Sequence, residues 1–334
     1  MKDDINNGLL FINEYFIPPE ILSLILSNVD VKNLYKHCTL VCKLWNDIIK
    51  SCVWKLKCDR QLLKTDHSQL FRQKQHPHYV YQALCVFKQS FYTNLIQNAC
   101  GLDGFNHWII DKNGGHRFII EDCILVDTNF REINDETVSK CFVTSYRQCS
   151  KLQMIDLCGR GGVTQQFIDE YQPPIYVSEW YGSRRDCGCM YQLRVILFDK
   201  DYQPFRRCNC NYSFSYRVPG WEGGFYQKVE YVFKNYGPNV RYIFFHYIGK
   251  DTQFWAGHYG SKFTNANVQL LLPGDTSKDH LIDLHSQQSY HEQCGCGCND
   301  SDCRQQKNDC QSLMYMFDKT LIAAVQKYKD EYFK

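Results

Sequence analysis

The sequence predicts a multidomain α+β protein with an N-terminal three-helix module, a helical linker, an antiparallel β-sandwich and a cysteine-rich tail that ends in a helix. Apolar residues at helical spacing dominate residues 10–58, and helical spacing continues in the linker, residues 59–92. Short aromatic and β-branched runs between turn residues fill residues 93–272. Residues 273–312 are polar and rich in cysteine, and residues 313–333 return to helical spacing.

Composition and charge narrow the class of protein. The net charge is only +2, so the concentrated basic surface that nucleic acid requires is not expected. The sequence contains no run of about 18 apolar residues, so a membrane span is not predicted. The N-terminal residues show no secretory signal. The odd number of 19 cysteines therefore fits reduced thiols better than complete disulfide pairing. We expect a cytoplasmic protein.

The first segment predicts three short helices. Pro18 and Pro19 stand where the first helix begins, a position that tolerates a missing N–H, and Asp30 is a predicted N-cap of the second. The third is predicted from Leu40, Val41, Leu44, Trp45, Ile48 and Ile49. About fifty residues cannot bury this much apolar surface alone. Either the module packs on the rest of the chain, or its surplus apolar face binds a partner.

The linker and the second segment show different periodicities. A helix between about residues 75 and 97 is predicted to act as a stiff spacer, from Tyr79, Tyr81, Ala83, Leu84, Phe87, Phe91 and Leu95. Strands follow, separated by Gly, Pro and Asn turns. The clearest predicted strands are Phe142–Tyr146, Ile175–Ser178, Tyr191–Phe198, Phe225–Phe233, Val240–Tyr247 and Val268–Leu272.

The N-terminal module carries four segments at a specific spacing, namely Ile17-Pro18-Pro19-Glu20-Ile21-Leu22, Ile25-Leu26, Val41-Cys42-Lys43-Leu44-Trp45 and Val53-Trp54. Together they resemble an F-box. This resemblance implies binding to a Skp-family adaptor, which bridges to the cullin and RING subunits of a ubiquitin ligase. The adaptor-binding and core positions that it implies are Ile17, Pro18, Ile21, Leu22, Ile25, Leu26, Leu34, Val41, Cys42, Trp45 and Trp54.

The second segment also carries ordered motifs. They are Asn94-Leu95-Ile96, Lys140 through Tyr146, Ile155-Asp156-Leu157, Glu179-Trp180-Tyr181, Asp186 through Cys189, Tyr236-Gly237-Pro238, Lys250 through Gly260, and Thr264-Asn265. This set resembles the F-box-associated (FBA) domain of the sugar-recognising F-box proteins. The resemblance implies a jelly-roll-like, galactose-binding-like sandwich of about ten antiparallel strands.

Loops at one end of that sandwich hold the inner chitobiose of high-mannose N-glycans in glycan-binding members of the family. Tyr146, Phe254 and Trp255 match the aromatic part of that pocket, where a sugar face stacks on a ring. Ala256 stands where the family has a sugar-contacting Lys. Loss of a charged hydrogen bond costs about 1.5–3 kcal/mol. Two interpretations of the target therefore stay open: the sandwich binds a glycan, or it binds a protein surface instead. For Trp255 itself, the alternative to a sugar contact is that it packs under its loop.

The tail has a cluster of thiols. Cys294, Cys296, Cys298 and Cys303 are candidate zinc ligands, since thiolates at close spacing can share one tetrahedral ion. A second Cys-x₂₋₄-Cys pair is absent, which favours a thiol-bearing loop without metal. The helix that follows is expected to dock on the sandwich or to bind a partner.

The functional hypothesis is a substrate-recognition subunit of an SCF (Skp–cullin–F-box) E3 ubiquitin ligase. The resemblance implies recruitment of N-glycosylated misfolded proteins after retrotranslocation (ERAD), for ubiquitination and proteasomal degradation. The alternative is the same subunit with a protein degron as its target. A hydrolase is not predicted, because no nucleophile elbow or metalloprotease helix is present. We expect no catalysis within this chain and no cofactor.

Overall fold

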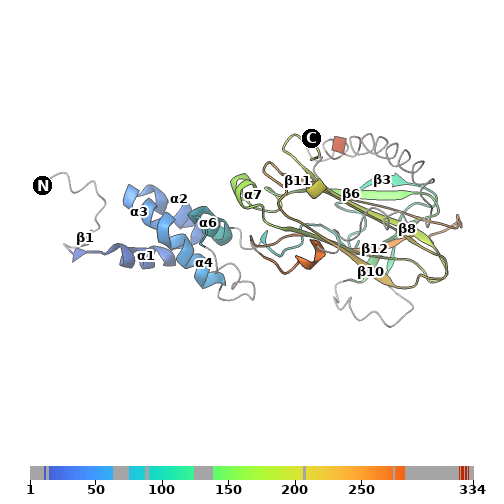
Figure 1. Ribbon diagram of the computed structural model, residues 1–334, viewed down its shortest axis with the longest axis horizontal. Coiled ribbons are helices and arrows are strands. Elements are labelled where there is room, and N and C mark those ends of the chain that lie inside the picture. Colours follow the sequence, from blue (N-terminus) through green and yellow to red (C-terminus); the bar gives the residue numbers. More distant parts are fainter. Residues whose placement is uncertain are drawn as a thin grey trace. The chain divides into compact units, whose positions relative to one another are not determined.

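The computed structural model describes residues 11–12, 15–62, 75–86, 90–123, 138–205, 208–273 and 275–282, together with residues 323, 325, 326, 328 and 330. The chain forms two compact units (Figure 1). The helical unit contains the described residues up to Thr93 and two later segments, Gly162–Pro174 and Leu270–Thr276. The sandwich unit contains Asn94–Gly161, Ile175–Gln269 and the described residues from Ser277 onward.

The helical unit begins with a two-stranded hairpin, β1 (Phe11–Ile12) and β2 (Tyr15–Phe16). Its helical elements are α1 (Pro19–Asn28), α2 (Val31–Lys36), η2 (Cys38–Leu40), α3 (Lys43–Ile48), η3 (Ile49–Val53), α4 (Trp54–Leu62), α6 (His78–Val86) and α7 (Gln165–Tyr171). Between α3 and α4, η3 is a π-helical turn, so the helical path from Lys43 to Leu62 has no break.

The ends of these helices follow the sequence signals. Pro19 is the first residue of α1, as predicted. The side chain of Asp30 accepts hydrogen bonds from the backbone N–H groups of Lys32 (2.9 Å) and Asn33 (3.1 Å), which confirms the predicted N-cap. Lys57 on α4 donates to the carbonyls of Ser27 (3.0 Å) and Val29, so a lysine from another helix satisfies the C-terminal end of α1.

Two helix predictions in this unit need correction. Leu40 and Val41 are not on the inner face of the third helix: they lie before α3 and are 80% and 59% exposed. The predicted spacer helix is also too long, because α6 ends at Val86. Beyond it, Tyr92 has a positive φ of 59° and its N–H donates to the carbonyl of Leu270 (2.9 Å), so the backbone has left the helical conformation.

Helix α7 was not predicted from the sequence. Thr164 caps its start by accepting from the N–H of Phe167 at 3.2 Å, and Gln172, in a left-handed conformation, ends it before two prolines. Within the helical unit, the ring of Tyr171 lies 5.2 Å from that of Tyr79 on α6. This segment therefore packs with α6, although it lies far along the chain from it.

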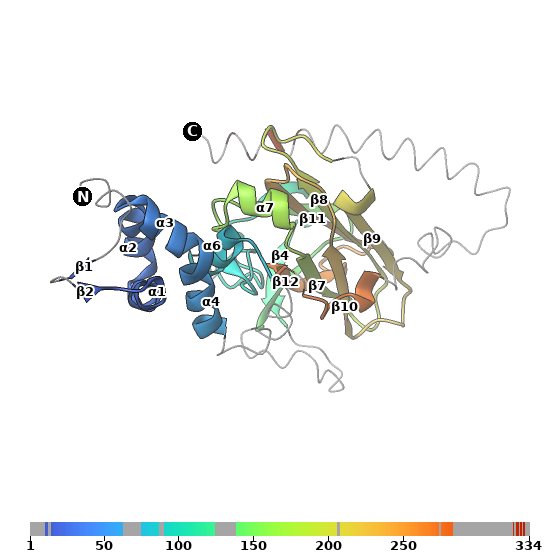
Figure 2. The same cartoon turned by 60° about the vertical axis from the view of Figure 1, so that its left-hand side comes forward.

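The sandwich unit consists of two antiparallel sheets of five strands, which confirms the predicted fold class (Figure 2). The first sheet has the order β10-β7-β12-β5-β4, with bounds Tyr226–Phe233, Ile175–Gly182, Lys262–Leu270, Lys140–Val143 and Ile119–Asp122. The second has the order β3-β6-β11-β8-β9, with bounds Ile109–Asn113, Cys149–Asp156, Tyr242–Asp251, Cys189–Phe198 and Asn211–Val218. Strands β3, β4, β6 and β9 were not among the clearest predicted runs.

Aromatic side chains of both sheets form the core between them. Tyr247 of β11 and Phe263 of β12 have ring centroids 4.1 Å apart. Lys151 of β6 is fully buried, and its Nζ lies 3.1 Å from the ring centroids of both Trp108 and Phe142. Burial lowers the pKa of Lys151 and raises that of the buried Glu179 to about 8. The core thus holds two ionisable groups that burial drives toward their neutral forms.

The outer face of the second sheet carries the chain's last described residues. Val325 and Tyr328 are helical and buried, and they pack in one cluster with Leu152, Phe198 and Phe244. This confirms the docking alternative for the final helix. The cysteine candidates for zinc, Cys294, Cys296, Cys298 and Cys303, lie outside the described residues.

Candidate functional site

The helical unit exposes a stripe of large apolar side chains on α1. Ile21, Leu24 and Ile25 are 48%, 45% and 51% exposed and follow the i, i+3, i+4 spacing of one helix face. Leu40 and Tyr35 are exposed on neighbouring elements. Such side chains lose contact with water only when a partner covers them, so this unit offers an apolar surface for another protein.

The structure divides the predicted adaptor-binding residues into two groups. Leu22, Leu26, Leu34 and Trp54 are buried and form the core of the unit. The exposed or half-buried positions are Ile17, Pro18, Ile21, Ile25, Val41, Cys42 and Trp45. Only the second group is available to a partner. Leu24, Tyr35 and Leu40 are also exposed but were not among the predicted adaptor-binding residues. The spacing of Leu24 relative to Ile21 and Ile25 could have indicated that it lies on the same helix face.

At one end of the sandwich, Asp251 organises the loop that follows β11. Its side chain is fully buried, and Oδ1 accepts from the N–H groups of Gln253 and, at 2.9 Å, Phe254. Oδ2 accepts from the N–H of Trp255 at 3.0 Å. A carboxylate that accepts several backbone hydrogen bonds is a strong anchor. The buried carboxylate therefore fixes the backbone of this loop, from which Phe254 and Trp255 are exposed.

The aromatic residues of this loop are exposed. Phe254 is 66% and Trp255 47% exposed, and Ala256 is exposed beside them. Trp255 is therefore not packed under its loop, and its ring is accessible to solvent. The ring of Trp255 stands at 87° to that of Tyr259, with centroids 6.0 Å apart. We call Tyr146, Phe254 and Trp255 the aromatic platform.

A second loop brings Tyr146 to the same end of the sandwich. Its neighbour Ser145 donates a hydrogen bond of 2.7 Å to the carbonyl of Gly257. The half-buried ring of Tyr146 lies 5.4 Å from that of His116, and His116 lies 6.1 Å from His258. The histidines were missed in the sequence, although His258 lies inside a motif that matched the family.

Cationic side chains lie at the edges of the platform. The Arg184 guanidinium lies 5.0 Å from the ring of Tyr259, and Lys250 Nζ lies 5.6 Å from that of Phe254. Cys187 and Cys189 follow Arg184 closely in the sequence, and both are buried. Burial raises the pKa of Cys187 to about 11 and that of Cys189 to about 12. These two thiols stay protonated near neutral pH, so neither is a ready nucleophile.

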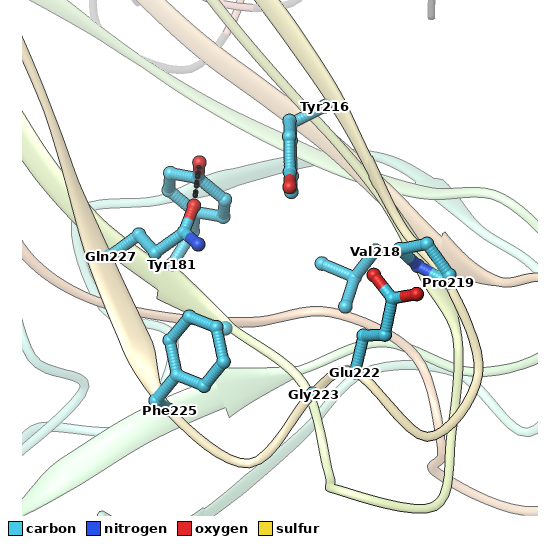
Figure 3. Close-up of a pocket in the computed structure, with 9 residues that line it drawn as sticks. Tyr181, Tyr216, Val218, Pro219, Glu222, Gly223, Phe225 and Gln227 are labelled. Atoms are coloured by element: carbon cyan, nitrogen blue, oxygen red, sulfur yellow. Dashed lines mark hydrogen bonds between the residues drawn. The ribbon is translucent and has the colours of Figure 1, made fainter.

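Two hollows lie elsewhere on the sandwich. The smaller hollow, drawn in Figure 3, is a cavity of about 60 Å³. At its edge the hydroxyl of Tyr181 donates a hydrogen bond of 2.6 Å to Oε1 of Gln227. That volume is large enough to hold water. The larger is an open groove of about 730 Å³ on the first sheet, lined by side chains of β7, β10 and β12 and by residues between Asn94 and Leu102. None of the predicted glycan-binding residues lines either hollow.

Within the described ranges, no group of three or more His, Cys, Asp or Glu side chains is placed to hold a metal ion. Among the helices that the structure describes, none is long and apolar enough to cross a membrane.

Comparison with known proteins identifies both units. The family described as "F-box-like" matches residues 15–60, and that described as "F-box associated region" matches residues 86–270. F-box only protein 6 of Bos taurus is 36% identical over 265 residues, which cover 78% of this chain and 93% of that protein. F-box only protein 44 of Homo sapiens is 34% identical over 264 residues, with coverage of 78% and 97%.

A solved carbohydrate-binding module in complex with β-1,4-galactotriose covers 53% of this chain and 99% of its own, with a TM-score of 0.33 and 11% identity.

The chain belongs to the F-box only proteins that carry an F-box associated region. Its two regions and its relatives support a role as a substrate-recognition subunit of an SCF ubiquitin ligase.

Proposed function

We propose that this chain recruits N-glycosylated proteins to an SCF ubiquitin ligase and that the aromatic platform binds the glycan. The exposure of Phe254 and Trp255 on a loop anchored by the buried Asp251 supports this most strongly. A pyranose presents an apolar face that stacks on such rings, and a rigid loop loses little conformational entropy on binding. The proposed target is a misfolded glycoprotein in the cytoplasm, which the proteasome then degrades.

The proposed partner at the other unit is a Skp-family adaptor, which connects the chain to cullin and RING subunits. The exposed stripe of Ile21, Leu24 and Ile25 supports this, since a few large apolar residues can carry most of the energy of an interface. The chain itself is proposed to be non-catalytic. Its contribution is to hold a target lysine close to a ubiquitin thioester that other subunits supply.

A glycan titration tests the platform. The full chain, purified with its adaptor, is titrated with chitobiose and with a high-mannose glycan. We expect Trp255→Ala to abolish binding and Ala256→Lys to strengthen it about 10- to 100-fold, because the lysine adds a charged hydrogen bond. Gln97→Ala, at an exposed position outside the platform, is the control and should not change the affinity.

Ala256 favours a second candidate, in which the platform binds a protein surface. Aromatic side chains are also the residues that dominate protein interfaces. Absence of glycan binding by the natural chain, together with binding by Ala256→Lys, would support this candidate. Absence of binding by both would leave the platform without a role in glycan recognition.

A further inference from the structure

Three amide side chains of one strand form the floor of the groove on the first sheet. Asn265, Asn267 and Gln269 lie at alternate positions of β12, and each is half-buried, while Ala266, Val268 and Leu270 between and beyond them are buried. Asn265 has a positive φ of 50°, a conformation that asparagine tolerates better than most residues. All three amides therefore face the groove.

These amides have unused hydrogen-bonding capacity. The side chains of Asn265, Asn267 and Gln269 make no hydrogen bond to any other residue that the structure describes. By contrast, Asn94 and Asn98 at the edge of the groove are engaged: Asn94 donates to the carbonyl of Ala266 (2.9 Å), and Asn98 to that of Gly104 (2.9 Å). Each free amide offers an acceptor oxygen and two N–H donors.

The opposite wall of the groove is basic. Lys228 Nζ lies 2.9 Å and Lys278 Nζ 3.9 Å from the same carboxylate oxygen of Glu230, which also accepts from the hydroxyl of Tyr176. Lys278 Nζ also lies 4.6 Å from the ring centroid of Tyr176. Two lysines thus share one carboxylate, which leaves a net positive charge beside the row of amides. An acidic group complements this wall.

The spacing of the amides matches the repeat of an extended peptide. Alternate residues of a strand are about 6.6–6.8 Å apart, and an extended peptide repeats its N–H and C=O groups on one edge at that same interval. We propose that this groove binds an extended peptide segment of the substrate, with Asn267 and Gln269 bonded to its backbone and an acidic side chain beside Lys278. A volume of about 730 Å³ lies within the range of ligand sites. This proposal rests on the role of substrate receptor, but not on glycan binding at the platform.

A peptide library tests the proposal. The full chain with its adaptor is probed against an immobilised positional-scanning library of unstructured dodecapeptides, and the best binders are measured in solution. Asn267→Ala combined with Gln269→Ala should reduce affinity at least tenfold. Asn265 is left unchanged because alanine is strained at its φ. Lys278→Ala should remove the preference for an acidic residue.

Gln192→Ala is the matched control, since it removes a half-buried amide from β8 of the other sheet. Equal unfolding temperatures of the variants exclude loss of fold as the cause. The proposal is overturned if no peptide binds, if the double variant and Gln192→Ala behave alike, or if a free high-mannose glycan displaces the peptide. Adaptor co-purification and the glycan titration of the platform are measured independently of peptide binding. A negative peptide result therefore contradicts the groove proposal without contradicting the proposed function.

Discussion

The backbone N–H of Trp255 donates a 3.0 Å hydrogen bond to Oδ2 of Asp251, a carboxylate with no exposed surface. The same side chain also accepts from the N–H of Phe254 at 2.9 Å. A residue buried at the end of a strand therefore fixes the backbone of two exposed aromatic residues at this end of the sandwich. The platform depends on Asp251 although Asp251 is not part of its surface.

Asp251→Asn is expected to lower the free energy of unfolding by about 1.5–3 kcal/mol, because a neutral amide is a weaker acceptor for these N–H groups and one of its two acceptor atoms becomes a donor. Urea unfolding measures this change. Asp201→Asn, at an exposed turn, is the control and should stay within about 0.5 kcal/mol of the natural chain. Equal stability of the two variants would contradict the anchoring role.

The adjacent residues Ile25 and Leu26 are predicted to respond differently to the same substitution. Ile25→Asp places a charge at a position that is 51% exposed, so the helical unit should fold normally but no longer co-purify with the adaptor. Leu26→Asp buries a carboxylate at a position that is 1% exposed, and should cost at least about 3 kcal/mol.

Circular dichroism melting of both variants separates binding from folding. Full adaptor binding by a folded Ile25→Asp variant would show that the exposed stripe on α1 is not the interface.

Glu179 should make the stability of the sandwich fall as pH rises. Burial raises its pKa in the folded protein to about 8, above the usual value of 4.5. Its contribution is therefore fully present below about pH 4.5 and is lost as pH rises through about 8, with a slope approaching 1.4 kcal/mol per pH unit. Urea unfolding between pH 5 and pH 8 measures the slope in the natural chain and in Glu179→Gln. The buried Lys151, whose lowered pKa acts in the opposite direction, is present in both proteins, so the difference between the two slopes reports Glu179. An identical slope in both proteins would refute the assignment.

Docking of the final helix is predicted to stabilise the sandwich. Val325 is 7% exposed and packs with Leu152 and Phe244, so Val325→Asp should cost about 3 kcal/mol or more. The adjacent Gln326 is exposed, and Gln326→Ala serves as the control, with a change of less than about 0.5 kcal/mol. A Val325→Asp variant as stable as the control would mean that the helix contributes nothing to the sandwich.

Local sequence signals were sufficient for several parts of this protein. Pro19 and Asp30 gave the starts of α1 and α2, since capping depends on a few neighbouring residues. Aromatic and β-branched runs between turn residues gave β7, β8, β10 and β11, although every residue of β7 is buried and only β8 alternates clearly between buried and more exposed residues. Strands β3 and β4 are short and lie in sequence without a clear alternating pattern, so only their pairing with β6 and β5 defines them.

Residue type and spacing were enough to predict the two-part organisation, the apolar helical module and the aromatic residues of the platform. The fold was needed to show which apolar residues face outward, since Ile25 and Leu26 are equally apolar and differ only in what packs against them. It also decided that the amides of β12 share one groove with Lys228 and Lys278. These residues come from separate strands and a later segment, and no local pattern encodes their meeting.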